Sequence, residues 1–325
     1  MTVDPLQFVR EFKQNITDRS LTYAVQRAGL DVFNGVNFTV TSRYPIGKNI
    51  FSEEWDLLLV LDACRVDAMR EVADEYPFIT DVDTIWSVGS SSHEWTVQTF
   101  STRYKGEIEE TALISTNPFA TATFRDELNP PYQRAFPIGS LAWNPVRKTD
   151  FAYFEVVSTD RTNLGGNVPP SKATDRAIDI GRQSVADRMV VHYFQPHRPF
   201  ISRTDDPATE SKLVYDRPYN KYEAGEISHE ELWEGYIENL RAVLDSVGLL
   251  LKNIEAERVV ITADHGQLIG ELGLTGHPPG LPHPAVKRVP WVETTATDEG
   301  SYQPQSEKTD ELEEVDERLR NLGYI

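Results

Sequence analysis

Residues 55–62 read Trp-Asp-Leu-Leu-Leu-Val-Leu-Asp, and this stretch decides the fold. The five residues 57–61 are all aliphatic, so the segment is apolar on both faces, which is typical of a strand buried inside a parallel sheet. A segment with helical periodicity follows over about 65–75. The stretch therefore predicts a strand-to-helix unit with an acidic residue, Asp62, at the tip of the strand.

Other apolar runs of strand length occur along the chain, at 111–115, 151–157, 188–194 and 258–262. Between the last two, apolar side chains recur at spacings of three and four over 229–253, which predicts a long amphipathic helix. Strands that alternate with helices predict an α/β fold. We expect a three-layer sandwich with a mostly parallel central sheet and helices on both faces.

The composition divides the chain into three expected segments. Residues 1–52 are expected to form an N-terminal lead-in, helical over 5–29, and residues 53–295 the α/β domain. After about residue 295 the sequence becomes polar and acidic. We expect 296–325 to be an acidic linker and a C-terminal helix, over 309–322, that packs on the domain.

The charge of the chain excludes one class of partner. Asp and Glu number 51 against 32 Lys and Arg, for a net charge of −19, so a nucleic-acid backbone would be repelled. The basic residues are 10 Lys and 22 Arg. An acidic excess with few lysines indicates a protein from a salt-loving organism, and an ordinary acidic enzyme with an acidic tail is the alternative.

The N-terminus and the cysteine content bear on location. The single Cys64 allows no intramolecular disulfide and is expected to be a small packing residue. No apolar run approaches the roughly 20 residues of a membrane span, and the first 20 residues contain no secretory apolar core. We expect a cytoplasmic protein without a transmembrane segment, and the oligomeric state stays open.

Three predicted strands end in residues that carry chemistry. In open α/β sheets, ligands bind beyond the carboxyl ends of the strands. Asp62 ends the first strand, Asp264 and His265 follow the last, and His197 follows the strand at 188–194. A lone Asp at a strand end is more often only a helix N-cap. Two carboxylates and an imidazole together suit a divalent cation.

The order of these motifs resembles the alkaline phosphatase superfamily, particularly its sulfatase-like branch. The motifs are the strand before Asp62, PHRPF at 196–200, TADHG at 262–266 and GELGLTGHPPG at 270–280, and the resemblance covers about 52–293. It implies an alkaline phosphatase-like fold. It also implies a metal-dependent enzyme acting on phosphate or sulfate esters.

The resemblance further implies a nucleophile that also binds the metal at a helix N-terminus, and segment 87–99 fits this position. The family spacing from Thr99 points to Ser90, with the neighbouring Ser91 as the alternative, whereas a Ser-rich capped turn would have no catalytic role. The implied ion is Zn, Mn, Mg or Ca, one or two in number. The implied metal set is Asp62, Ser90, Asp264 and His265.

Four further residues are implied as substrate-binding. His197 would line the substrate pocket, and a protonated His277 would neutralise charge or assist the leaving oxygen. His283, between two prolines, is more ambiguous. Arg65 would hold a substrate anion, or it would form a local ion pair with Asp67.

The resulting hypothesis is a metal-dependent hydrolase or transferase that acts on phosphate esters through a serine nucleophile and a covalent phospho-enzyme. Its substrate would be a small-molecule or glycan phosphate or sulfate ester. A sulfatase is the first alternative, although the Pro and Arg of the formylglycine signature are missing after Ser90. A catalytically degenerate member of the fold that binds an anion or a glycan is the second.

Overall fold

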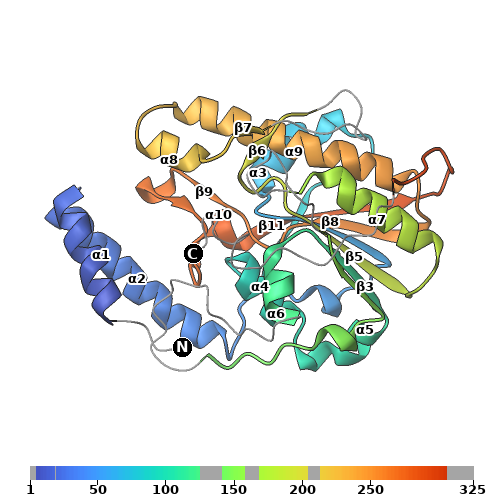
Figure 1. Cartoon of the computed structure of the whole chain (residues 1–325), viewed down its shortest axis with the longest axis horizontal. Helices are drawn as coiled ribbons and strands as arrows, with labels where there is room; N and C mark the ends of the chain where they lie inside the picture. Colours follow the sequence, from blue (N-terminus) through green and yellow to red (C-terminus); the bar gives the residue numbers. More distant parts are fainter. Residues whose placement is uncertain (1–4, 19, 125–140, 158–167, 204–212, 306–325) are drawn as a thin grey trace.

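The computed structural model describes residues 5–18, 20–124, 141–157, 168–203 and 213–305. Its centre is a seven-stranded sheet with the strand order β2-β11-β8-β1-β5-β3-β4 (Figure 1). The strands of this sheet are β1 (Leu57–Leu61), β2 (Asp83–Trp86), β3 (Thr111–Ser115), β4 (Tyr153–Val156), β5 (Arg188–Tyr193), β8 (Ala256–Thr262) and β11 (Arg288–Ala296).

Within the sheet, β1 lies between β5 and β8 and runs parallel to both, and β3 runs parallel to β5 and β4. Only β11 runs the other way, because it pairs antiparallel with β8 and with β2. The carboxyl ends of β1, β3, β5 and β8 therefore meet at one edge. The prediction of a mostly parallel central sheet is confirmed.

Helices cover both faces of the sheet. One face carries α3 (Val66–Val72), α7 (Pro170–Arg182) and α9 (His229–Leu251), and the other carries α4 (Ser92–Thr99), α5 (Lys105–Glu109) and α6 (Pro118–Phe124). The side chains of β1 alternate between the two apolar cores. Leu57, Leu59 and Leu61 join the core under α9, whereas Leu58 and Val60 join the core under α4. Burial on both faces explains why the strand is continuously aliphatic.

Smaller elements complete the described chain. They are the strands β6 (Phe200–Ile201), β7 (Leu213–Tyr215), β9 (Leu268–Ile269) and β10 (Thr275–Gly276), the helices α8 (Pro218–Glu223) and α10 (Pro284–Lys287), and the 3-10 turns η1 (Ile50–Ser52), η2 (Ala73–Glu75), η3 (Thr102–Tyr104), η4 (Lys148–Asp150) and η5 (Glu271–Gly273). β6 pairs with β7, and β9 pairs with β10, in two-stranded antiparallel ribbons.

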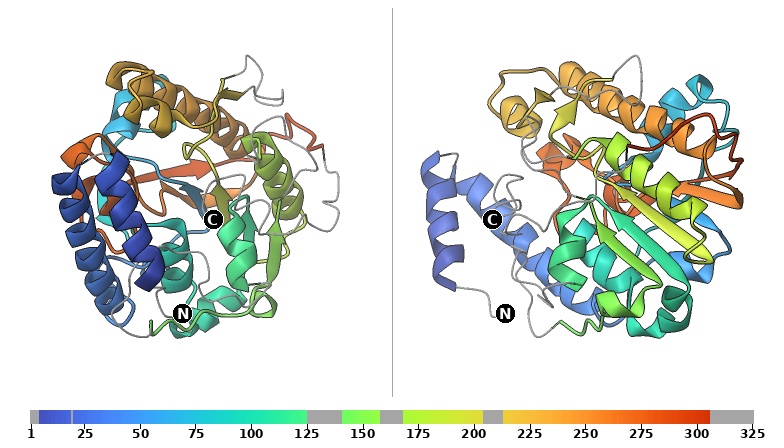
Figure 2. Two further views of the ribbon diagram at one scale, coloured as in Figure 1. Left: turned by 60° about the vertical axis from the view of Figure 1, so that its left-hand side comes forward. Right: turned by 45° about the vertical axis from the view of Figure 1, so that its right-hand side comes forward.

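The N-terminal arm consists of α1 (Pro5–Asp18) and α2 (Leu21–Thr41), which stand at one edge of the molecule (Figures 1 and 2). The expected helix over 5–29 is wrong in its bounds. The helix is interrupted between α1 and α2, and α2 continues to residue 41. No described helix is both long enough and apolar enough to span a bilayer. The expected C-terminal helix over 309–322 lies outside the described residues.

Candidate metal centre and active site

Asp62, Asp264 and His265 converge at the carboxyl edge of the sheet. Asp62 directly follows β1, and Asp264 comes two residues after the end of the neighbouring β8. All three side chains are fully buried, and one ligand atom from each lies within 4.8 Å of the other two. Adjacent parallel strands that end together bring residues 200 positions apart into one cluster.

Hydrogen bonds fix one oxygen of each carboxylate. Asp264 Oδ1 accepts from the backbone N–H of Ala63 at 3.0 Å and of His265 at 2.8 Å. Asp62 Oδ2 accepts from the Asn117 amide at 2.6 Å. Each carboxylate is thus held in one orientation, with its second oxygen directed into the cluster.

The imidazole of His265 is oriented by its own backbone. Nδ1 lies 2.7 Å from the carbonyl oxygen of Gly266, so Nδ1 carries the hydrogen and donates it. Nε2 then presents a lone pair at 3.4 Å from Asp264 Oδ2 and 3.6 Å from Asp62 Oδ1. A histidine held by a carbonyl in this way is the usual form of a metal ligand.

The free atoms of the cluster fit a divalent cation. Among the described residues, Asp62 Oδ1, Asp264 Oδ2 and His192 Nε2 are buried without a hydrogen-bond partner, although such atoms in proteins nearly always have one. Burial, together with the charge of Asp264, raises the pKa of Asp62 well above its ordinary value. A bound cation would satisfy these atoms and compensate both carboxylates, and the oxygen and nitrogen donors suit Zn, Mn or a similar ion.

Ser92 is the serine that lies at the cluster. It is the first residue of α4, and its Oγ is 3.1 Å from His265 Nε2 and 3.2 Å from Asp62 Oδ2. The N-terminus of α4 therefore points at the cluster. Helix N-termini present free N–H groups and a positive dipole end, which suit phosphate or sulfate oxygens.

Ser90 and Ser91 have other partners. The Ser90 backbone N–H and hydroxyl both donate to Glu94 Oε2 at 2.8 Å, and the hydroxyl also reaches the Pro278 carbonyl oxygen at 3.2 Å. Ser91 is the N-cap of α4, with its side chain accepting from the Glu94 N–H. Ser90 thus binds Glu94 and Ser91 caps α4, whereas the serine that contacts Asp62 and His265 is Ser92, where the helix begins.

His197 and His277 form a pair beside the cluster. Their Nε2 atoms are 3.2 Å apart, and the ring of His277 stacks on that of His265 with centroids 4.2 Å apart. Burial lowers the pKa of both His197 and His277 well below the ordinary value. The charge of Arg198 lowers the pKa of His197 further, and the neighbouring imidazoles lower that of His277. The imidazoles are therefore neutral, which differs from the protonated His277 expected from the sequence.

Arg65 and His283 have structural roles. Arg65 forms a bidentate pair with Asp67 at 2.6 and 2.9 Å, and it donates to Glu271 at 2.6 Å and to the Gln267 carbonyl at 3.0 Å. These contacts use four of the five guanidinium N–H donors. Arg65 therefore forms the local ion pair with Asp67, and few donors are left to bind a substrate anion. His283 caps α10, since its Nδ1 accepts from the next-but-one N–H at 3.1 Å.

Two residues of the site were not selected from the sequence. Asn117 comes two residues after the end of β3, so the rule that led to Asp62 and Asp264 also applied to it. His192 lies on β5, and its Nε2 is 3.6 Å from Asp264 Oδ2. The sequence did not single out His192 because it lies within an apolar run. The pattern of a strand alone does not show which of its side chains reaches the site.

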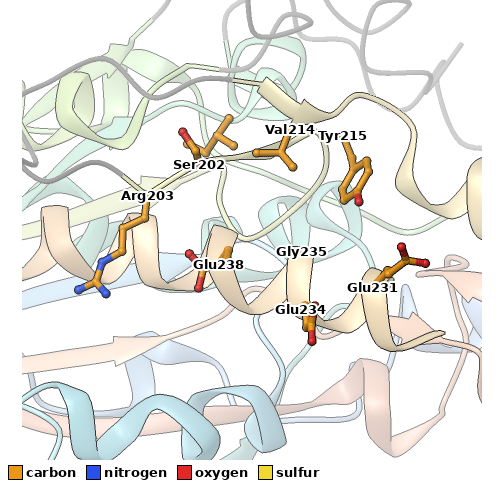
Figure 3. Close-up of a pocket in the computed structure, with 9 residues that line it drawn as sticks. Ser202, Arg203, Val214, Tyr215, Glu231, Glu234, Gly235 and Glu238 are labelled. Carbon is orange, nitrogen blue, oxygen red and sulfur yellow. The ribbon is translucent and has the colours of Figure 1, made fainter. Parts of the chain in front are cut away.

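A separate groove of about 440 Å³ lies between the β6–β7 ribbon and α9, with Glu231, Glu234 and Glu238 along one side (Figure 3). Its one cationic side chain, Arg203, already forms a bidentate pair with Asp245 at 2.6 and 2.9 Å. None of the cluster residues lines this groove. The candidate active site is therefore the cluster at the carboxyl edge of the sheet.

Comparisons with known proteins give a likeness of fold. No family model and no curated protein matches the sequence. Among solved structures, the chain is similar to the periplasmic domain of EptC from Escherichia coli in complex with Zn (12% identity, TM-score 0.46, 80% of this chain and 78% of that one). It is similar to the integral membrane phosphoethanolamine transferase EptA from Neisseria meningitidis (13% identity, TM-score 0.45, 90% of this chain and 59% of that one). It is also similar to a 2-O GAG sulfatase (12%, TM-score 0.42, 74% of this chain and 64% of that one).

Proposed function

We propose that this protein is a metal-dependent enzyme that hydrolyses or transfers phosphate esters, with Ser92 as its nucleophile in place of Ser90. The observation that carries the proposal is the position of the Ser92 hydroxyl. It begins a helix and lies within hydrogen-bond distance of both Asp62 and His265. Beside it are two buried carboxylate oxygens that have no partner among the described residues.

Asp62, Asp264, His265 and Ser92 would hold the cation. When bound, such an ion lowers the pKa of a coordinated hydroxyl and compensates the charge on phosphoryl oxygens. The first-turn N–H groups of α4 would bind those oxygens from the side of the helix. The hydrogen bond from Asn117 to Asp62 and the one from the Ala63 N–H to Asp264 keep these two carboxylate ligands in place without further rearrangement.

The reaction would proceed in two displacements. Ser92 Oγ attacks phosphorus while its proton passes to Asp62 Oδ2, which it already contacts at 3.2 Å, and the bond from phosphorus to the alcohol oxygen breaks. The departing alkoxide, beside the neutral His197–His277 pair, takes a proton from solvent water and leaves as the alcohol. Water or an acceptor alcohol then attacks phosphorus and loses its proton to solvent, the bond to Ser92 Oγ breaks, and Ser92 Oγ regains the proton held by Asp62 as the product is released.

The residues after the nucleophile favour phosphate over sulfate. The sequence from Ser92 reads Ser-His-Glu-Trp-Thr, so the Pro and Arg of the formylglycine signature are missing from this serine as well. An unmodified serine suits attack on phosphorus. A degenerate binding protein, the remaining alternative, would show no turnover with any ester or metal.

The experiment is a chromogenic assay with nitrophenyl phosphate, bis-nitrophenyl phosphate and nitrophenyl sulfate, in high KCl with Mn, Zn or Mg. We expect turnover of a phosphate ester that Ser92→Ala lowers at least a hundredfold. Ser91→Ala, in the same turn, should keep activity within a few-fold. Acid quenching during turnover should trap phosphate on Ser92. Phosphate on Ser90, or full activity of Ser92→Ala, would contradict the assignment.

A further inference from the structure

Arg198 is an arginine without an ion pair beside the candidate active site. It is half-buried in the loop between β5 and β6, and its guanidinium has no hydrogen bond or ion pair within the part of the chain that the structure describes. By contrast, Arg65, Arg176 and Arg241 each bind two carboxylates. A guanidinium left free on a chain with a net charge of −19 is available to bind an anion from outside.

A series of short contacts connects Arg198 to the candidate nucleophile. The Arg198 carbonyl oxygen lies 2.6 Å from His197 Nδ1, and His197 Nε2 lies 3.2 Å from His277 Nε2. The His277 ring stacks on that of His265 with centroids 4.2 Å apart, and His265 Nε2 is 3.1 Å from Ser92 Oγ. The charge of Arg198 also lowers the pKa of both His197 and His277, so its guanidinium lies within electrostatic reach of this pair.

Tyr219 lies beside the same loop. It is 7% exposed, and its ring meets that of Phe200, two residues after Arg198, edge-on with centroids 6.0 Å apart. Its phenol has no hydrogen bond to any described residue. Burial raises the pKa of Tyr219, so the hydroxyl keeps its hydrogen, and the charges of Arg198 and Asp62 both act on this pKa. A hydroxyl donor within reach of a free guanidinium suits the oxygens of an anion.

The proposed reaction determines which part of a substrate would face these two residues. Displacement at phosphorus places the attacking and the leaving oxygen roughly in line, so the alcohol departs on the side opposite Ser92 Oγ. The phosphoryl oxygens contact the candidate metal site and the first turn of α4. The alcohol part therefore extends past the His197–His277 pair, toward Arg198 and Tyr219.

We propose that Arg198 and Tyr219 form a subsite for an oxyanion on the alcohol part of the substrate. The preferred substrate is then a phosphate ester that carries a second anionic group, either a phosphate or a carboxylate. Arg198 would bind two oxygens of this group through parallel N–H donors, and the Tyr219 hydroxyl would donate to the same group. The inference rests on the proposed function, which supplies the direction in which the substrate lies.

The test is isothermal titration calorimetry of the full chain with Mn and three phosphonates that cannot be hydrolysed, at the lowest KCl concentration that keeps the circular dichroism of the folded protein. The probes are benzylphosphonate, 4-carboxybenzylphosphonate and 1,4-xylylenebisphosphonate. The last two add a carboxylate or a second phosphonate to the first. We expect the wild type to bind one of these two at least about tenfold more tightly than benzylphosphonate, and the tighter one identifies the second anion.

Two variants test the residues of the subsite. Arg198→Gln should reduce the ratio of these affinities to about one, and Tyr219→Phe should reduce it by a few-fold. Arg217→Gln is the matched control, because Arg217 is the N-cap residue of α8, its side chain is 69% exposed, and it pairs with the adjacent Asp216 at 3.6 Å. It removes the same charge nearby and should keep the wild-type ratio.

Equal wild-type affinity for all three phosphonates, or binding of none, would overturn the proposal. A wild-type ratio in Arg198→Gln, or an equal loss in Arg217→Gln, would also overturn it. Turnover of nitrophenyl phosphate separates this inference from the proposed function. Turnover without selectivity among the phosphonates would refute the subsite and keep the enzyme, whereas selectivity without turnover of any ester would keep the subsite and refute catalysis.

Discussion

The side chain of Asn117 and the backbone N–H of Ala63 have the same role. Asn117 donates to one oxygen of Asp62 and Ala63 to one oxygen of Asp264, and in each carboxylate the other oxygen is directed into the cluster. The backbone donor is available whatever the side chains are. The amide of Asn117 is supplied by one side chain only, so this contact can be removed without altering a proposed ligand.

We predict that Asn117→Ala lowers the affinity for Mn or Zn by about 10- to 100-fold, the usual effect of removing a group that orients a metal ligand. Isothermal titration calorimetry with each metal measures it. Asn144→Ala is the control, because the Asn144 amide donates to Thr102 at an exposed position. Equal metal affinity in Asn117→Ala and the wild type would show that Asp62 does not need this donor.

His93 makes the stability of the fold depend on pH. It is fully buried, its ring stacks on Phe119 with centroids 5.2 Å apart, and neither ring nitrogen has a partner among the described residues. Burial lowers its pKa to about 3. As the pH falls, the unfolded chain therefore binds a proton at His93 that the folded chain does not bind. The stability of the fold is not reduced by this proton above pH 6.5, and it decreases as the pH falls toward 3.

We predict that His93→Phe, which keeps a flat ring against Phe119, loses less stability on acidification than the wild type. Between pH 7.5 and 4.5 the difference should be about 3 kcal/mol, from about 1.4 kcal/mol per unit of pKa. Urea unfolding at both pH values measures it. Any packing cost of the larger ring cancels in the comparison, and equal losses in both proteins would refute the explanation.

At the scale of single residues, the sequence pointed to Asp62, Asp264 and His265, which the structure brings together, whereas the serine that it selected, Ser90, lies two residues before Ser92, the nucleophile that we propose. Residues 90–92 are three consecutive serines, and nothing in their composition shows where the helix begins. The helix start is set by Ser91 as the N-cap and by Glu94, whose carboxylate binds Ser90. These are contacts between side chains and backbone that a spacing rule does not contain.

Among the elements, α2 depends on one close approach. Gly280 has φ +74°, and a Cβ there would lie 2.5 Å from the Asn34 carbonyl oxygen and 2.8 Å from the Cβ of Phe38. The loop that follows His277 can therefore touch α2 only if this position is glycine.

We predict that Gly280→Ala loosens the N-terminal arm while the α/β core stays folded. Limited trypsin digestion should cut the arm, for example at Arg27, at least several times faster than in the wild type. Gly225→Ala is a matched control, because Gly225 has a similar φ of +73° but a Cβ there meets nothing within 4 Å. Equal digestion rates in the two variants would contradict the close-contact explanation.

The elements that were predicted correctly are those with a pronounced apolar pattern. The run at 111–115 is β3 itself, and the helix expected over 229–253 is α9 to within two residues. α7 was not predicted, because its segment is largely polar, with Arg176 paired to Glu155 of β4. The short edge strand β2 also has no apolar run, and its position follows only from pairing with β11.

For the whole molecule, the net charge of −19 is the property with the broadest effect. Repulsion between carboxylates opposes the compact state, and it acts over roughly 30 Å at 0.01 M salt but only about 3 Å at 1 M. We predict that the melting temperature climbs steeply between dilute buffer and molar KCl, as expected for a protein from a salt-loving organism. Differential scanning fluorimetry across KCl concentrations measures it, and a flat response would favour the ordinary acidic enzyme.

The central position of β1 between β5 and β8 has a consequence for biosynthesis. Asp62 leaves the ribosome about 200 residues before its partner Asp264, and β8 can pair only after the chain has passed residue 262. Contacts this distant in sequence form slowly, because a long loop must close before they can contribute. A nascent chain therefore acquires the complete carboxylate cluster only after β8 and Asp264 have been synthesised, and a metal ion that needs both carboxylates could bind only then.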